Sequence, residues 1–265
     1  MSSTNNSLWA RFKAVPLDNP LKTMFITVVV CLVASIVVTY PALELRPIQE
    51  INKLNEKRKN ILQVAGLYEE GKTIDEMFDR VDARVVDLRT GRFTTAVGVN
   101  FDEIKALKSD TLSKPLTKAE DIASIRRQSF YQVVYLIKDG DVTSKVILPI
   151  HGYGLWSTLY GFVAVNADGN TIEGLKFYAH EETPGLGGEV DNPMWQAKWP
   201  NKKIKNKNGD IAISVVKGGA TGDYQVDALS GATLTSVGVN NLVRFWTGKN
   251  GFESFLEFVA NGGLK

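Results

Sequence analysis

The hydrophobic positions of the chain change their spacing along the sequence, and each spacing predicts a different structure. An apolar stretch without a charged residue runs from Thr23 to Leu43. At about 1.5 Å per residue, a helix of this length spans roughly 30 Å, the thickness of a bilayer core. The stretch lacks the polar face of a buried core helix, and it lacks the small residues that a signal-peptide cleavage site needs. We therefore predict one uncleaved membrane-spanning helix over residues 23–43.

The next region, residues 44–130, mixes several short patterns. Apolar residues at heptad-like spacing predict an amphipathic helix that ends at Gly66 or Gly71. A short helix is expected next, followed by two strands around a turn at Thr90. The remaining polar stretch has no assigned function. We treat residues 44–130 as a membrane-proximal region of helical and mixed structure and residues 1–22 as a tail that precedes the membrane span.

β-Branched and aromatic residues dominate short runs in the last region, residues 131–265. Residues 132–150 and 159–180 each contain two such runs on either side of an Asp-Gly pair, which is the pattern of a β-hairpin. Residues 210–218 predict one further strand, and a final helix begins at residues 233–236. Strands followed by helices predict an α+β fold, in which helices cover a sheet.

Composition removes several kinds of site from consideration. The single cysteine, Cys31, excludes an intrachain disulfide framework and a metal site of several thiolates from this chain. The two histidines, His151 and His180, make a multi-histidine metal centre unexpected. The formal net charge of +2 gives no reason to expect nucleic acid as a partner. Electrons passing through this protein would need a bound organic cofactor.

The segment DALSGATLTS, residues 227–236, carries more hydroxyl groups than a helix start requires. One hydroxyl is enough to cap the first turn of a helix. This segment has four, on Ser230, Thr233, Thr235 and Ser236. Helix capping is the ordinary interpretation, and the surplus of hydroxyl groups indicates a ligand.

Two glycine-rich segments precede this motif. HEETPGLGGEV, residues 180–190, has neither the Gly-Lys-Ser/Thr of a Walker A loop nor the spacing of a dinucleotide fingerprint. It is either an ordinary turn or a wall of backbone amides against a flat or anionic ligand, with Glu182 and Thr183 supplying side-chain hydrogen bonds. HGYGLW, residues 151–156, is the other segment. A tryptophan such as Trp156 more often packs in a hydrophobic core than stacks on a cofactor.

Together these segments resemble the FMN-binding domain in the C subunit of the sodium-translocating NADH:quinone reductase, a domain that the G subunit of Rnf-type complexes shares. The resemblance rests on Gly152–Trp156, His180–Val190 and Asp227–Ser236, and it extends over the whole chain. In that family the Asp-x-x-Ser-Gly-Ala-Thr signature carries FMN on the threonine that follows Gly-Ala, through a phosphoester bond. The equivalent residue here is Thr233. Chain length and the long insert over residues 48–128 favour the reductase family over the Rnf family.

The resemblance implies a covalent FMN site around Thr233. A threonine hydroxyl is a poor nucleophile, so a separate flavin transferase is expected to attach the FMN. Its phosphate would lie at a helix N-terminus, where N–H groups and the helix dipole favour an anion. Ser230 and Thr235 would donate hydrogen bonds to it, and Lys217 would stabilise a reduced flavin. No catalytic residue or metal ligand is assigned, and the candidate cofactor-binding residues are Thr233, Ser230, Gly231, Ala232, Leu234, Thr235, Glu182, Thr183, Gly185, Leu186, Gly187, Trp156 and Lys217.

The function implied by the resemblance is electron transfer within a membrane complex. FMN would relay electrons from an iron–sulfur centre to the flavin of another subunit, on the path to ubiquinone. The chain would be a subunit of an NADH:ubiquinone oxidoreductase that pumps sodium, without a complete active site of its own. An Rnf-type subunit, a membrane-anchored flavin-binding or sensory module without electron relay, and a purely structural anchor remain open as alternatives.

The expected location is the bacterial inner membrane, crossed once. Basic residues flank the apolar stretch on both sides, so their number does not choose an orientation. The family places the flavin domain in the periplasm and the short tail, residues 1–22 here, in the cytoplasm. The expected partners are the other subunits of the complex, the flavin transferase and the lipid bilayer.

Overall fold

The computed structural model describes residues 12–16, 19–140 and 142–264. Of the expected tail over residues 1–22, residues 1–11 and 17–18 lie outside this description. The chain divides into two compact units, residues 1–55 and 56–265. The functional candidates all lie in the second unit.

Helix α2 (Pro20–Ala65) contains the apolar stretch, and its residues over 23–43 are exposed throughout. Among the described residues it is the one helix that is long and apolar enough to cross a membrane. Helix α2 continues without a break beyond residue 43. Pro41 and Pro47 lie inside it, although a proline in a helix interior removes a hydrogen bond and costs about 3 kcal/mol. The helix ends at the expected glycine: Gly66 has a φ of +72°, and the N–H of Leu67 donates to the Leu62 carbonyl over 2.8 Å.

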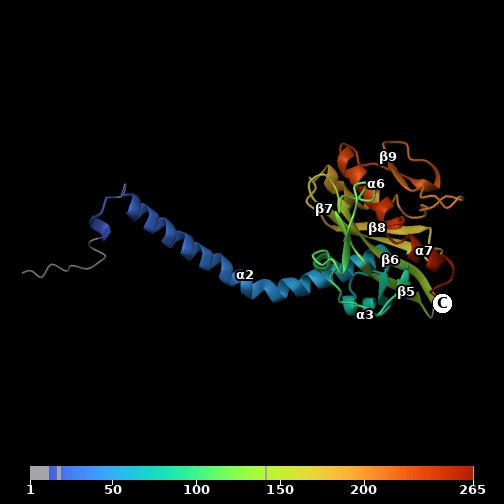
Figure 1. Ribbon diagram of the computed structural model, residues 1–265, viewed down its shortest axis with the longest axis horizontal. Coiled ribbons are helices and arrows are strands. Elements are labelled where there is room, and N and C mark those ends of the chain that lie inside the picture. The colour runs from blue at the N-terminus through green and yellow to red at the C-terminus, as the bar shows by residue number, and fades with distance from the viewer. Residues whose placement is uncertain (1–11, 17–18, 141, 265) are drawn as a thin grey trace, which may run out of the picture. The chain divides into compact units, whose positions relative to one another are not determined.

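The main sheet of the second unit has six antiparallel strands in the order β2-β1-β5-β6-β7-β8 (Figure 1). These strands are β1 (Val81–Asp87), β2 (Arg92–Phe93), β5 (Tyr131–Asp139), β6 (Val142–Tyr153), β7 (Thr158–Asn166) and β8 (Ile172–Ala179). The expected hairpins β5–β6 and β7–β8 are confirmed, as is the strand–turn–strand of β1 and β2. Strands β1 and β2 precede residue 131, so the sheet crosses the domain boundary that we expected there. The compact unit begins at Glu56 instead.

Helices cover both faces of this sheet. Successive side chains of β5 alternate between the faces, as in any strand. Val133 and Tyr135 pack in a cluster with Ile61 of α2, whereas Val134 and Leu136 belong to the larger core with the C-terminal helices. Both faces are buried, and this explains why β5 is apolar over consecutive positions.

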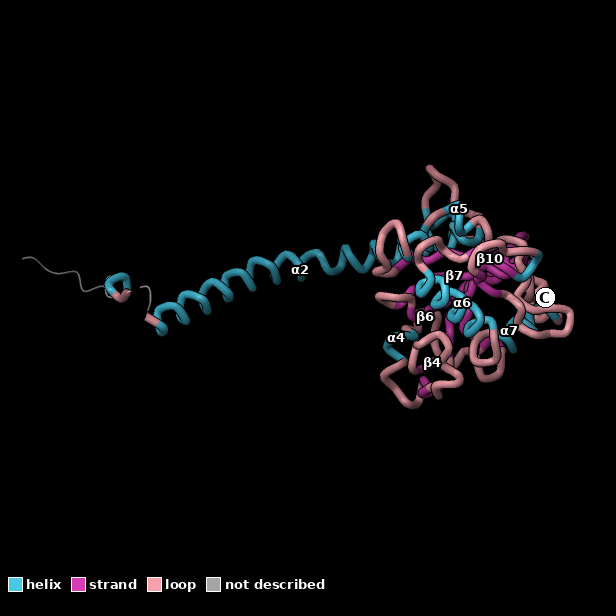
Figure 2. The backbone as a smooth tube through the Cα atoms, turned by 90° about the horizontal axis from the view of Figure 1, so that it is seen from above, coloured by secondary structure: helices cyan, strands magenta, loops and turns pink. Residues whose placement is uncertain are grey.

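Short elements complete the second unit. They are α3 (Ile74–Phe78), α4 (Glu103–Ala106), β3 (Ser113–Pro115), β4 (Arg127–Ser129), η1 (Gly187–Asp191), α5 (Pro193–Gln196), β9 (Ser214–Val216), η2 (Gly222–Tyr224) and β10 (Gln225–Asp227), with the longer α6 (Thr233–Thr247) and α7 (Glu253–Ala260). Helix α6 begins within the expected range and lies across the sheet (Figure 2). Its Trp246 is fully buried and donates from Nε1 to the His151 carbonyl over 2.6 Å. Helix α6 is thereby held against the last part of β6.

Candidate functional site

The segment 227–236 joins strand β10 to helix α6. Asp227 ends the strand, and its carboxylate accepts hydrogen bonds from the N–H of Ala220 over 2.8 Å and from Lys198 Nζ over 2.9 Å. These two donors, the backbone N–H first, hold the pKa of Asp227 below its ordinary value. The side chain of Asp227 therefore connects the end of β10 to Ala220 and Lys198.

The first turn of α6 has free donors. Ala232 occupies the N-cap position and supplies no side-chain cap. The backbone N–H groups of Thr233, Leu234 and Thr235 have no acceptor among the described residues, and the first N–H bonded back to the cap is that of Ser236, over 3.0 Å to the Ala232 carbonyl. Unsatisfied N–H groups at the positive end of a 15-residue helix form a site that favours an anion.

The four hydroxyl groups of the motif divide into two pairs. Ser236 and Thr235 are buried and bonded within the protein: Ser236 Oγ accepts from the N–H of Leu229 over 3.0 Å and donates to the Ala232 carbonyl over 2.9 Å. Ser230 and Thr233 are exposed. Of these two, Thr233 alone lies on the first turn of α6. The structure thus separates two structural hydroxyl groups from two accessible ones, which the sequence pattern could not do.

Thr235 is hydrogen-bonded to Glu182, which is 53 residues earlier in the chain. Thr235 Oγ1 donates to Glu182 Oε2 over 2.6 Å, and the two residues are 0% and 5% exposed. The hydroxyl proton of Thr235 is therefore directed at the protein and not at a phosphate. The side chain of Thr235 is hydrogen-bonded within the protein, whereas its backbone N–H has no acceptor among the described residues.

The other oxygen of Glu182 holds the segment that contains Trp156. Glu182 Oε1 accepts from the N–H groups of Leu155 and Trp156, each over 2.9 Å, and of Ser157 over 3.4 Å. Burial raises the pKa of Glu182, but the hydrogen bonds from Thr235 and from these backbone groups outweigh it, so the pKa lies below its ordinary value. A single carboxylate joins all three segments that the sequence singled out. Both of its oxygens accept hydrogen bonds from protein donors.

Two glycines make room for this carboxylate. A Cβ at Gly154 would lie 2.6 Å from Glu182 Oε1, and a Cβ at Gly187 would lie 2.6 Å from Oε2 and 2.5 Å from Thr235 Oγ1. Both distances are shorter than any tolerable contact. Gly185 differs, because a Cβ there would meet no atom within 4 Å, and its φ of +75° is what favours glycine. Gly187 therefore packs against the Glu182 and Thr235 side chains, whereas the space beside Gly185 is open, and the wall against a ligand stays a prediction.

Three apolar side chains on the segments that Glu182 joins are exposed. Trp156 is 65% exposed, Leu234 60% and Leu186 45%. A Cβ on Gly231 would lie 3.2 Å from Leu186 Cδ2, so this leucine lies next to the turn before α6. Trp156 is therefore not a core residue, in contrast to the usual position of tryptophan.

Thr183 and Lys217 are the two remaining candidates. The carbonyl of Thr183 accepts from the N–H groups of Leu186 and Gly188 over 3.1 and 2.9 Å, so its backbone shapes the loop while its side chain is exposed. Lys217 follows β9 instead of lying within it, and its exposed side chain makes no hydrogen bond or ion pair with the described residues. The structure does not bring Lys217 into contact with the other candidates.

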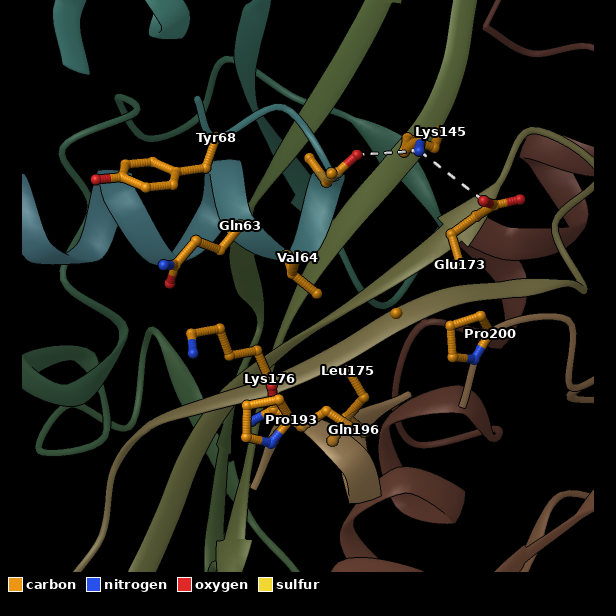
Figure 3. A pocket seen from close by; sticks show the side chains of 13 residues that line it. Gln63, Val64, Tyr68, Lys145, Glu173, Leu175, Lys176, Pro193, Gln196 and Pro200 are labelled. Atoms are coloured by element: carbon orange, nitrogen blue, oxygen red, sulfur yellow. Dashed lines mark hydrogen bonds and ion pairs between the residues drawn. The ribbon is translucent and has the colours of Figure 1, made fainter. Parts of the chain in front are cut away.

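A cavity of about 620 Å³ lies elsewhere and involves none of the candidates (Figure 3). It is formed by the end of α2, strand β8 and helix α5. Lys145 Nζ donates to the Ala65 carbonyl over 3.0 Å and lies 3.9 Å from Glu173 Oε2. A cation at the C-terminus of a helix stabilises it, so Lys145 is explained as a cap on α2.

Comparison with known proteins covers the same residues. Residues 154–248 match the family described as FMN-binding domain, a range that includes residues 154–156, 180–190 and 227–236 and the whole of α6. The C subunit of the Na(+)-translocating NADH-quinone reductase of Pseudomonas aeruginosa is 47% identical over 255 residues, which are 92% of this chain and 98% of that protein. The protein of the same name from Vibrio anguillarum is 46% identical over 250 residues, 93% of this chain and 98% of that protein.

The chain belongs to the C-subunit family of the Na(+)-translocating NADH-quinone reductase. Solved structures of the family agree. The crystal structure of Shewanella oneidensis NqrC is similar with a TM-score of 0.73 and 35% identity, over 80% of this chain and 99% of that one. The C subunit from Parabacteroides distasonis gives a TM-score of 0.62 and 27% identity, over 81% and 96%. The α+β fold behind one N-terminal apolar helix is thereby confirmed.

FMN fits the residues that this chain places around Thr233. The free N–H groups at the start of α6 suit its phosphate, because they are unsatisfied donors at the positive end of a helix dipole. The exposed side chains of Trp156, Leu186 and Leu234 suit a flat, largely apolar ring. The family match to an FMN-binding domain over 154–248 and the local chemistry therefore point to the same cofactor.

The two loop glycines should respond differently to substitution. Gly187→Ala should lower the free energy of unfolding by about 1–3 kcal/mol, because the new Cβ must displace Glu182 or Thr235. Gly185→Asn should cost less than about 1 kcal/mol, since asparagine tolerates a positive φ and the space is open. Chemical denaturation followed by circular dichroism measures both. An equal cost at both positions would contradict the packing described for Gly187.

Acid should weaken the Glu182 hydrogen bonds. A carboxylate whose folded pKa is depressed stabilises the fold above its unfolded pKa, about 4.3, and loses that contribution as the pH falls through the folded pKa. The free energy of unfolding of the unmodified chain, minus that of Glu182→Gln, should therefore decrease between about pH 5 and pH 3. Glu181→Gln, at the exposed neighbouring residue, reports the background effect of removing a carboxylate. A difference that stays constant or grows on acidification would refute the assignment.

Proposed function

We propose that this chain is the FMN-carrying electron-transfer subunit of a sodium-translocating NADH-quinone reductase, with the FMN attached to Thr233 through a phosphoester. The observation that carries the proposal is the position of the Thr233 hydroxyl. It is exposed, it lies on the first turn of α6, and the neighbouring hydroxyl groups of Thr235 and Ser236 are buried and bonded to protein groups. Family membership supplies the cofactor and the complex.

Attachment requires chemistry that this chain does not supply. Thr233 Oγ1 would form a bond to the flavin-bearing phosphorus of a pyrophosphate ester of the flavin, while the bridging P–O bond breaks and the second phosphate leaves with the bridging oxygen and its electron pair. The hydroxyl proton must pass to a base. Glu182, the carboxylate that accepts from the first turn of α6, is hydrogen-bonded to Thr235 and not to Thr233. We therefore assign the base and the activation of the donor to a separate flavin transferase.

The residues of this chain then have distinct roles toward the cofactor. The N–H groups of Thr233, Leu234 and Thr235 would hold the phosphate, and Trp156 and Leu186 would lie against the ring. Ser230 is exposed beside the attachment point and is available as a further donor. Bound FMN supplies the redox chemistry, and the protein supplies position and electrostatics. Other subunits must deliver and remove the electrons, so the chain is a relay and has no complete active site.

Topology follows from the single apolar helix. Everything after residue 43 lies on one side of the membrane if α2 crosses once, since no other described helix is long and apolar enough to cross. We place the second unit in the periplasm and the helix in the bacterial inner membrane. The orientation is supported by the family resemblance and not by the flanking charges.

Replacement of the acceptor hydroxyl should abolish covalent flavin without unfolding the protein. Thr233→Ala should carry no flavin after denaturation, whereas Ser230→Ala should keep it. An exposed substitution of this kind changes stability by about 0.5 kcal/mol or less. Intact mass and in-gel flavin fluorescence measure the attachment, and circular dichroism measures the fold. Flavin that persists on Thr233→Ala would overturn the assignment of the acceptor.

Thiol labelling tests the orientation. In a Cys31→Ser background, Lys207→Cys introduces a thiol at an exposed position of the second unit. It should react with a membrane-impermeant maleimide in cells whose outer membrane is permeable. A cysteine introduced in the tail at Ser3 should react only after the inner membrane is broken. The reverse pattern would contradict a periplasmic flavin domain.

A further inference from the structure

Glu182 is a buried carboxylate without a basic partner. It is 5% exposed, and among the described residues no lysine, arginine or histidine forms an ion pair with it. A buried charge is costly unless hydrogen bonds or an opposite charge compensate it. Here the compensation consists of three backbone N–H groups and one hydroxyl. Because a buried charge is costly, its presence among the candidate residues indicates a function for Glu182 beyond packing.

The donors that Glu182 collects come from two separate parts of the site. Oε1 accepts from the segment 155–157, which presents Trp156, and Oε2 accepts from Thr235 in the first turn of α6. A backbone hydrogen bond from the N–H of Glu182 to His180 Nδ1, over 3.2 Å, holds the residue in its own loop. His180 Nε2 lies 2.9 Å from Asp191 Oδ2 at the far end of that loop. The carboxylate therefore ties the loop, the aromatic segment and the helix start together.

We propose that Glu182 is the positioning residue of the flavin site: its carboxylate fixes Trp156 and the first turn of α6 relative to each other so that Thr233 can receive and orient the cofactor. The inference rests on the proposed function, since it concerns the site of the same FMN. Glu182 acts through Trp156 and Thr235 and does not itself touch the flavin. Its effect comes from hydrogen-bond geometry, since its two oxygens reach donors on two different segments.

Three variants and one control separate this role from others. Glu182→Ala removes all four acceptor contacts. Glu182→Gln keeps an oxygen for the 155–157 N–H groups and an amide that can bond to Thr235 Oγ1, which then accepts. Thr235→Val removes one contact and keeps its volume. Glu181→Gln changes the exposed neighbouring carboxylate and serves as the matched control.

The first measurement needs no flavin. Backbone hydrogen exchange of residues 153–158 is measured in the full-length, flavin-free chain. This segment contains the N–H groups of residues 155–157, from which Glu182 accepts hydrogen bonds. Exchange should accelerate about tenfold or more in Glu182→Ala, and it should stay near the unmodified rate in Glu182→Gln and Glu181→Gln. Unchanged exchange in Glu182→Ala would overturn the proposal. This holds whether or not Thr233 carries the flavin.

The second measurement is the rate of flavin attachment, followed by intact mass with the transferase and its flavin donor. Misplacement of a reacting group by about 1 Å can cost about 100-fold in rate. Attachment should be about 10- to 100-fold slower in Glu182→Ala, slowed less in Thr235→Val and largely restored in Glu182→Gln. A Glu182→Gln variant as slow as Glu182→Ala would overturn the proposal, because charge and not geometry would then be decisive. Failure of the unmodified chain to take flavin on Thr233 would instead refute the proposed function.

Discussion

The hydrogen bonds of one buried carboxylate determine the geometry of the candidate site. Glu182 accepts from the 155–157 segment on one oxygen and from Thr235 on the other, so three segments that are far apart in sequence meet at a single side chain. Gly154 and Gly187 are glycines because a Cβ at either position would occupy the space of this carboxylate or of its partner. These hydrogen bonds fix the positions of the three segments relative to one another.

The consequence for Thr233 is accessibility. Because Thr235 and Ser236 are turned inward, the first turn of α6 presents Thr233 and three free N–H groups to solvent, beside the exposed Trp156, Leu186 and Leu234. In the function we propose, Thr233 is the attachment point, the N–H groups are the anion site and the apolar side chains contact the ring. Such a site would hold a cofactor near the surface, as an electron carrier between other proteins requires. The buried core beneath it, with Trp246 bonded to His151, keeps α6 fixed on the sheet.

Much of this arrangement follows from local patterns in the sequence. The apolar stretch of α2, the two Asp-Gly hairpins and the start of α6 were predictable because each depends on residues close together in the chain. The family resemblance rested on the segments that meet at the site, and it singled out Thr233. What could not be predicted depends on contacts over long sequence distances. Glu182 and Thr235 looked like ligand contacts, and only the fold shows that they satisfy each other; strand β1 looked like part of a separate region, and only its pairing with β5 shows otherwise.

Glu182 and Thr235 should be energetically coupled, because they share one buried hydrogen bond, and a double-mutant cycle measures the coupling energy. The free energy of unfolding would be determined for the unmodified chain, Glu182→Ala, Thr235→Val and the chain with both substitutions. Residues in one hydrogen-bond network couple by about 0.5–3 kcal/mol. We predict a coupling of at least about 1 kcal/mol, because the bond is short, buried and charge-assisted. Additivity of the two single substitutions within about 0.3–0.5 kcal/mol would contradict the account.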